Sequence, residues 1–300
     1  MQFRTSGVVF ATLCLIWGST WLAIKIGLEF LPPFLFAGIR FAVASLALLV
    51  LVRLLHARVP KDLSSWILML FLGIFQISLP YGLVFWGEQY ISSGISSLLF
   101  ATLPFFVVIF AHFMIPSERL TKSKAIGIVA SFVGLTAIFW RDIIASQSSG
   151  VHNSLYGGLA VVGSALSGGS ASVVVKLHAH RIDPAANVLV QAITGTVVLS
   201  SVGLLIERNS TLQFTPIAIA ATLYLGIVGS ALAFVGLYWL LTRTAATATN
   251  TSLIVFVTPI IALIMGWVVL GEVLDANVAL GAILILAGVY LTVKPASRST

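Results

Sequence analysis

Arg40 is the residue with the clearest capacity to bind a solute, because it is a cation inside an apolar run. It lies several residues into the stretch 34–54. If that stretch crosses a membrane, a charged side chain there is costly and is expected to face a cavity or a partner. A guanidinium in a cavity would pair with a carboxylate, through two hydrogen bonds where the geometry allows. The alternatives are snorkelling to the water boundary and a structural ion pair with Glu29 or Glu88.

A second group of residues is suited to line a pocket: Ser78, Tyr81, Phe85 and Glu88. Their spacing of 3, 4 and 3 places them on one helical face. Later in the chain, Phe234 and Tyr238 stand at positions that match Tyr81 and Phe85. Pocket walls combine aromatic side chains with a few placed polar groups. The alternative is core packing together with an aromatic belt at the membrane interface.

The complete set of predicted substrate-binding residues is Trp17, Arg40, Ser78, Tyr81, Phe85, Glu88, Gln191, Phe234, Tyr238 and Asn250. Asn250 precedes an apolar helix, where it could line a pathway or bond across helices. Pro104 and Pro259 each lie within a predicted helix, remove one backbone hydrogen bond and predict a kink. We expect these two kinks to serve gating, although a static kink is equally compatible with the pattern.

Neither a metal, nor a cofactor, nor an enzymatic reaction is indicated by the sequence. Cys14 is the one cysteine, so an internal disulfide and a multi-cysteine metal site are both excluded. An enzyme would need convergent nucleophile, base or metal-ligand residues. The chain has no HExxH motif, no serine elbow and no glycine-rich phosphate loop. We therefore predict a protein that is not an enzyme.

The composition predicts an integral membrane protein. Of 300 residues, 59% are hydrophobic and 8% are charged, and the mean hydropathy is +1.10. Soluble domains carry about 25% charged residues. A membrane-crossing helix needs about 20 apolar residues, and ten stretches qualify: 7–28, 34–54, 66–87, 93–115, 122–140, 155–177, 187–206, 215–241, 246–270 and 276–294.

The ten stretches form an internal repeat. Lys25 corresponds to Lys176, Arg40 to Gln191, Trp86 to Trp239, Pro104 to Pro259, and Gly127 and Gly134 to Gly281 and Gly288. Each half has five helices, an odd number, so the second half enters the membrane from the opposite side. We therefore predict an all-α membrane protein of two inverted five-helix repeats, 1–145 and 150–295, around a central cavity.

The basic residues predict the orientation. With the amino terminus inside, twelve of the sixteen lysines and arginines are cytoplasmic: Arg4, Arg53, Arg58, Lys61, Arg119, Lys122, Lys124, Lys176, Arg181, Arg243, Lys294 and Arg298. This excess predicts a multi-pass protein of the inner membrane with both termini in the cytoplasm. Because the basic residues lie between apolar segments, we expect the lipid bilayer as a partner and no nucleic acid.

Several motifs resemble those of the EamA family of the drug/metabolite transporter superfamily. They are Trp17-Gly18-Ser19-Thr20, the prolines at 104 and 259, and Leu270-Gly271-Glu272 before a glycine-rich last helix. The first half departs from the last motif, reading Pro116-Ser117-Glu118, so we expect its cap to be built differently. The resemblance implies a ten-helix basket whose cavity opens alternately to each side. It also implies export of amino acids, other metabolites or drugs.

These observations together predict a secondary transporter that exports amino acids, aromatic ones among them, or related small metabolites. The main rival is a sugar-phosphate or nucleotide-sugar antiporter, which should offer clustered cavity lysines or arginines. A drug exporter of another specificity and a passive channel are further alternatives. We expect a small-molecule substrate, and a monomer or a weak oligomer.

Both termini and Glu118 are expected in the cytoplasm, with Glu272 outside. In a Cys14→Ser background, cysteines introduced beside these positions should be labelled by a membrane-impermeant maleimide only from the predicted side. Finding the two glutamates on the same side would contradict the inverted repeat.

Overall fold

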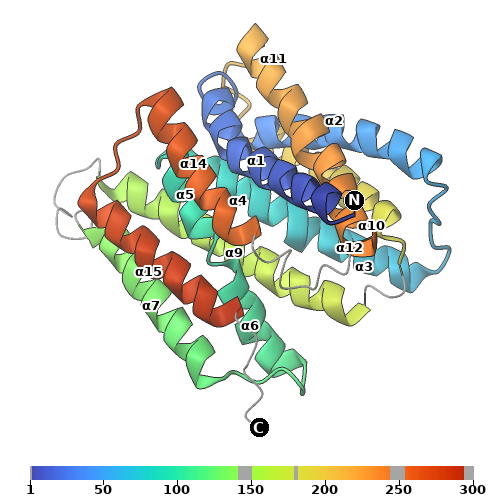
Figure 1. Ribbon diagram of the computed structural model, residues 1–300. Coiled ribbons are helices and arrows are strands. Elements are labelled where there is room, and N and C mark those ends of the chain that lie inside the picture. The colour runs from blue at the N-terminus through green and yellow to red at the C-terminus, as the bar shows by residue number, and fades with distance from the viewer. Residues whose placement is uncertain (1, 141–150, 179–181, 244–253, 294–300) are drawn as a thin grey trace.

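The computed structural model describes residues 2–140, 151–178, 182–243 and 254–293, and in these ranges the chain is helical with connecting turns. The helices, of which η1 and η3 are π-helical, are α1 (Gln2–Leu28), α2 (Pro33–Leu54), α3 (Leu63–Leu72), η1 (Gly73–Ser78), α4 (Leu79–Glu88), α5 (Ser93–Phe100), α6 (Leu103–Met114), α7 (Lys122–Ile138), α9 (Val151–His178), α10 (Pro184–Ile206), α11 (Pro216–Leu223), η3 (Tyr224–Leu232), α12 (Ala233–Arg243), α14 (Ile254–Leu270) and α15 (Ala276–Val293). Figure 1 shows their arrangement.

These helices form the ten helical segments expected from the sequence, several of which run through more than one labelled helix. Among the described residues, eight segments are long and apolar enough to cross a membrane, and the described part of the ninth segment, α14, is an apolar helix. Capping residues begin many of them. Ser92, Thr121, Asp183 and Thr215 each accept a backbone N–H from the first turn that follows, which satisfies donors that the helix itself cannot.

The fourth segment is broken, whereas the sequence predicted one helix kinked at Pro104. α5 ends at Phe100, a turn follows at Ala101 and Thr102, and α6 begins at Leu103. Pro104 therefore lies in the first turn of α6. The N–H groups of a first turn have no partner within the helix, so the N–H that proline lacks breaks no helical hydrogen bond. Its repeat equivalent, Pro259, does lie inside a continuous helix, α14. Equivalent prolines thus occupy different local structures in the two halves.

Two π-helical segments, η1 and η3, occupy equivalent places in the two halves and were not predicted. In each, a serine hydroxyl donates to the carbonyl five residues earlier: Ser78 to Gly73 O at 2.8 Å and Ser230 to Leu225 O at 2.9 Å. A π turn carries an extra residue and loosens the backbone ladder, and it is frequent at functional sites. Both segments face the interior of the basket, as the buried Ser78 and Ser230 show.

The most extensive helix pair between the two halves is α7 and α15, which lie side by side in Figure 1. A Cβ atom on Gly127 would come within 2.5 Å of the Gly288 carbonyl, and one on Gly134 within 2.8 Å of the Gly281 carbonyl. Gly127 corresponds in the repeat to Gly281, and Gly134 to Gly288. Exchanging the two halves therefore turns the Gly127–Gly288 contact into the Gly134–Gly281 contact, as a two-fold axis between α7 and α15 requires. Small residues let the backbones approach in this way.

Gly288→Ala should destabilise this contact, because the new methyl group would overlap the Ser131 hydroxyl and the Gly127 carbonyl. We expect a loss of about 1–3 kcal/mol, typical of overpacking, seen as a lower thermal midpoint in detergent. Gly7→Ala is the matched control, since nothing lies within 4 Å of a Cβ there. Equal midpoints for the two variants would show that the helices can separate without cost.

Candidate functional site

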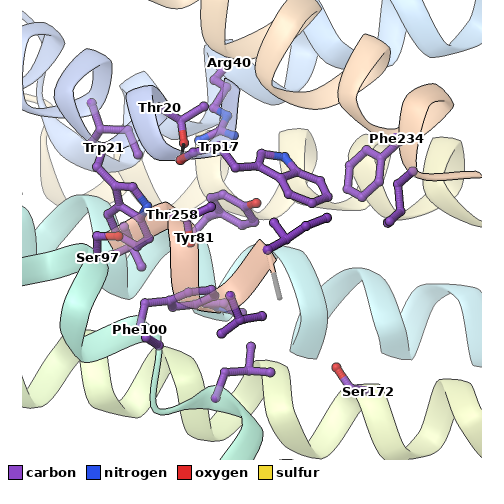
Figure 2. A pocket seen from close by; sticks show the side chains of 18 residues that line it. Trp17, Thr20, Trp21, Arg40, Tyr81, Ser97, Phe100, Ser172, Phe234 and Thr258 are labelled. Atoms are coloured by element: carbon purple, nitrogen blue, oxygen red, sulfur yellow. Dashed lines mark hydrogen bonds between the residues drawn. The ribbon is translucent and has the colours of Figure 1, made fainter. Parts of the chain in front are cut away.

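A cavity of about 790 Å³ lies between the two halves, with walls from both. Figure 2 shows Trp17 and Tyr81 near its middle, Trp21 and Phe100 to one side, and Phe234 on the other. The polar residues of the wall include Thr20, Ser97, Ser172, Thr258 and Arg40. The wall is therefore an aromatic enclosure with a few placed polar groups, as small-molecule sites usually are.

A second cavity of about 630 Å³ continues the first, since both are lined by Tyr81, Phe100, Ser172 and Phe234. It extends to Leu55 and Pro184, residues that are exposed at the ends of their helices. We call this end of the molecule, where α2 ends and α10 begins, the open end. The opposite end, where α1 ends and α2 begins, we call the sealed end.

Arg40 is 2% exposed and is held by aromatic rings more than by hydrogen bonds. Its guanidinium carbon lies 4.7 Å from the ring centre of Tyr81, 5.3 Å from that of Phe41 and 5.7 Å from that of Phe85. Such cation–π contacts stabilise a desolvated cation. Nη2 makes one long hydrogen bond, 3.4 Å, to the Ser230 hydroxyl. Nε and Nη1 are buried and have no hydrogen-bond partner among the described residues.

The segment η3 fixes the wall around Arg40. Trp17 Nε1 donates to the Gly229 carbonyl at 3.3 Å, and the Trp17 ring meets Phe234 edge-on with centroids 6.5 Å apart. Ser230, which accepts from Arg40, belongs to the same π turn. The π-helical segment η3 of the second half therefore positions two side chains of the first half, Trp17 and Arg40.

Two carboxylates close the sealed end by capping helices of the other half. Glu207 accepts from the backbone N–H groups of Phe34 and Leu35, both at 2.9 Å, at the start of α2. Glu272 accepts from Ser93 N at 2.7 Å and Gly94 N at 3.2 Å, at the start of α5. A negative charge at a helix amino terminus is favourable. Each cap joins one repeat to the other across this end.

The Leu270-Gly271-Glu272 motif places the Glu272 carboxylate at the start of α5. Gly271 has φ of +65°, a left-handed conformation that glycine adopts without strain. Glu272 N then donates back to the Gly266 carbonyl at 3.1 Å, so the chain after Gly271 folds back on the last turns of α14. Gly266 leaves space for the carboxylate, since a Cβ there would overlap it.

Residues that correspond in the repeat have different bonding partners at the two ends of the molecule. At the sealed end, Lys25 donates to the carbonyls of Glu88 at 2.6 Å and Ile91 at 2.8 Å, where α4 ends. At the open end, the equivalent Lys176 pairs with Glu118, and both side chains are partly exposed. Exposed ion pairs contribute little to stability. Glu118 thus pairs with a lysine side chain, whereas Glu272 accepts from backbone N–H groups.

A cavity between two repeats, sealed at one end, is the architecture of a transporter, and the comparisons with known proteins decide the family. The EamA-like transporter family model matches residues 5–140 and 155–294. The chain belongs to this family. The transporter YoaV of Bacillus subtilis is 31% identical over 296 residues, covering 97% of each chain. The inner membrane transporter YedA of Escherichia coli is 28% identical over 303 residues, covering 97% of this chain and 94% of YedA.

A solved crystal structure shares the fold of this EamA-like transporter. It superposes with a TM-score of 0.65 over 96% of this chain and 97% of its own, at 17% sequence identity. The family and the fold together show a multi-pass membrane transporter built from two repeats.

The structure brings together some of the predicted site residues of this EamA-like transporter. Trp17, Arg40, Tyr81 and Phe234 line the first cavity, and Gln191 lines the second. Three predicted residues lie elsewhere: the Ser78 hydroxyl is bonded within η1, Phe85 packs against Phe36 behind the wall, and Glu88 is buried beyond it. The side chain of Tyr238, and Asn250 altogether, lie outside the described residues.

The sequence reasoning missed several lining residues: Thr20, Trp21, Phe100, Ser97 and Ser172. Trp17, Thr20, Trp21 and Ile24 follow the spacing of one helical face, which was a usable signal. Phe100 carried no such signal, because it is the last residue of α5 before the break at Ala101. Its position depends on that break.

Glu272→Gln should weaken the sealed end, because a hydrogen bond to a charged group is worth about 1.5–3 kcal/mol. In a Cys14→Ser background with Ile91→Cys as the reporter, we expect the impermeant maleimide to label the introduced thiol about tenfold faster from the sealed side. Glu29→Gln removes an exposed carboxylate at the same end and is the matched control. Identical labelling rates in both variants would mean that the cap does not hold this end closed.

Proposed function

We propose that this EamA-like transporter exports amino acids or related small carboxylates across the inner membrane by alternating access. The observation that carries the proposal is Arg40, a residue of the cavity wall whose Nε and Nη1 are buried and unpartnered among the described residues. A desolvated cation with two donors left over is matched by a carboxylate, which accepts two parallel hydrogen bonds.

The shape and lining of the cavity support a substrate with an apolar part. About 790 Å³ bounded by tryptophan, tyrosine and phenylalanine accommodates an amino acid with a large side chain. The aromatic part of such a substrate would lie against Trp17, Trp21 and Phe100. Its carboxylate would then reach Arg40 on the sealed side of the cavity.

The seal at one end supports alternating access. With the orientation that the basic residues predict, the open end faces the cytoplasm, where a substrate for export would enter. The break before Pro104 and the proline inside α14 are places where helices could bend as the ends exchange. A closed end held by two carboxylate caps and one lysine can open by losing a small number of bonds.

A sugar-phosphate or nucleotide-sugar antiporter has less support. Phosphate recognition would be expected to use several cavity cations, and among the described lining residues Arg40 is the one lysine or arginine. Lys25 and Lys176, which correspond in the two repeats, are bonded to main-chain carbonyls and to Glu118, respectively.

Arg40→Gln should slow the transport of carboxylate substrates about 30-fold, since it removes about 2 kcal/mol of charge-assisted hydrogen bonding. Arg40→Lys keeps the charge but not the planar fork, so it should be partly active. The measurement is saturable flux of a panel of labelled amino acids in proteoliposomes. Arg208→Gln, which removes an exposed arginine, is the matched control.

The same assay separates recognition from structure. Amine analogues that lack the carboxylate should be transported at similar rates by the wild type and by Arg40→Gln. If Arg40→Gln slows both classes equally, Arg40 holds the helices together and does not bind the substrate.

A further inference from the structure

The second cavity carries three side-chain amides that have no role in the proposed binding of a carboxylate. They are Gln76 on η1 and Asn187 and Gln191 on α10. Most of the remaining wall is aliphatic, with aromatic residues and one serine where it joins the first cavity, and none of its described lining residues carries a charge. The amides are therefore the main groups there that could recognise a solute by hydrogen bonds.

These amides lack hydrogen bonds in the described part of the chain. No bond ends on the side chain of Gln76 or Gln191, and neither amide is completely buried. Gln191 as a whole is 4% exposed, so the surface that its amide keeps belongs to the cavity that it lines. Asn187 Oδ1 is fully buried and has no partner. Polar groups left unbonded inside a protein are costly, and a solute with matching groups would remove this cost.

Two packed helices bring the three amides to one cavity. Asn187 and Gln191 are four residues apart, so they lie on the same face of α10. η1 packs against α10 one turn further on, where a Cβ on Gly195 would come within 2.6 Å of Ile77 Cγ2. Gln76 precedes Ile77 in η1 and lines the same cavity. One amide therefore comes from the first half of the chain and two come from the second.

Gln191 is the repeat equivalent of Arg40, and the two residues line different cavities. Tyr81, Phe100 and Phe234, drawn in Figure 2, line both cavities, so a solute can extend from one into the other. Arg40 is matched by a carboxylate. A charged group beside Gln191 would be desolvated without a counter-charge, whereas an uncharged group with donors and acceptors would complement the amides.

We infer that Gln76, Asn187 and Gln191 form a subsite for an uncharged hydrogen-bonding group at the end of the solute that is remote from its carboxylate. A carboxamide is the closest match, because it donates and accepts as the three side chains do. The solute then has its carboxylate at Arg40, its apolar part against the shared aromatic residues, and its polar end towards the open end. This inference rests on the proposed function and narrows the class of its substrate.

Three probes that differ only at the far end test the inference: L-phenylalanine, 4-carbamoyl-L-phenylalanine and 4-carboxy-L-phenylalanine. Calorimetry of the purified transporter in detergent gives the Kd of each. Wild-type protein should bind the carbamoyl compound about tenfold more tightly than phenylalanine, because its amide meets unbonded partners. It should bind the carboxy compound about tenfold more weakly than phenylalanine, because the second carboxylate loses water without gaining a cation.

Substitutions at the amides should change this preference. Gln191→Leu is similar in size but has no amide, so it should bind phenylalanine and the carbamoyl compound with equal affinity. Asn187→Leu should reduce the same advantage and serves if the first variant does not fold. Gln191→Arg introduces the side chain that the repeat equivalent already has, so the carboxy compound should become the tightest of the three. Gln213→Leu, the same change at an exposed glutamine, should match the wild type.

Equal affinities of the wild type for phenylalanine and the carbamoyl compound would overturn the inference and leave the proposed function intact, and this comparison needs no variant to fold. An advantage of the carbamoyl compound that survives in both Gln191→Leu and Asn187→Leu would also overturn it, because the amide would then bind elsewhere. Failure of the proposed function gives a different result: the wild type binds none of the three probes, and both proposals are lost.

Discussion

The arrangement of the molecule depends on the capping of helix amino termini by carboxylates from the other repeat. Glu207 caps α2 and Glu272 caps α5. A helix terminus inside an apolar structure leaves N–H groups that must be bonded, and here the partner lies 173 or 179 residues away in the chain. Each cap therefore satisfies a local requirement of one helix and fixes the position of one half against the other. The cavity is closed at this end because these two requirements are met together.

At the open end, the residues that correspond in the repeat to those of the sealed end make different bonds. Lys176 and Glu118 correspond to Lys25 and Glu272, yet they pair with each other at the surface. α10 begins at its own Asp183, which accepts from Ala185 and Ala186 at 2.9 Å and 3.3 Å, whereas α2 depends on Glu207. At the sealed end, α2 is thus capped by a carboxylate of the other half, whereas at the open end α10 is capped by a carboxylate of its own half.

The sequence was sufficient for features that depend on periodicity and composition. The ten helical segments, the small-residue faces of α7 and α15 and the aromatic character of the cavity all follow from patterns of that kind. Phe85 and Ser78 show why the site was harder. The residues Leu79–Glu88 do form a regular α-helix, but its cavity face is that of Pro80, Tyr81 and Val84. The Ser78 hydroxyl is bonded within η1, which ends at this residue. Phe85 is turned towards Phe36. The caps at Glu207 and Glu272 were beyond reach, because no periodicity relates residues that meet only in the fold.

Arg40 and Lys25 show how the binding site and the seal are connected. Arg40 lines the cavity from α2, while Lys25 on α1 holds the end of α4 through the carbonyls of Glu88 and Ile91. Ile24, the neighbour of Lys25 on α1, lines the cavity itself. α1 therefore forms part of the cavity wall and also makes bonds that close the sealed end. A displacement of α1 by a bound solute would act on both, and in this way occupancy of the cavity can change the stability of the seal, as a carrier requires in order to open one end at a time.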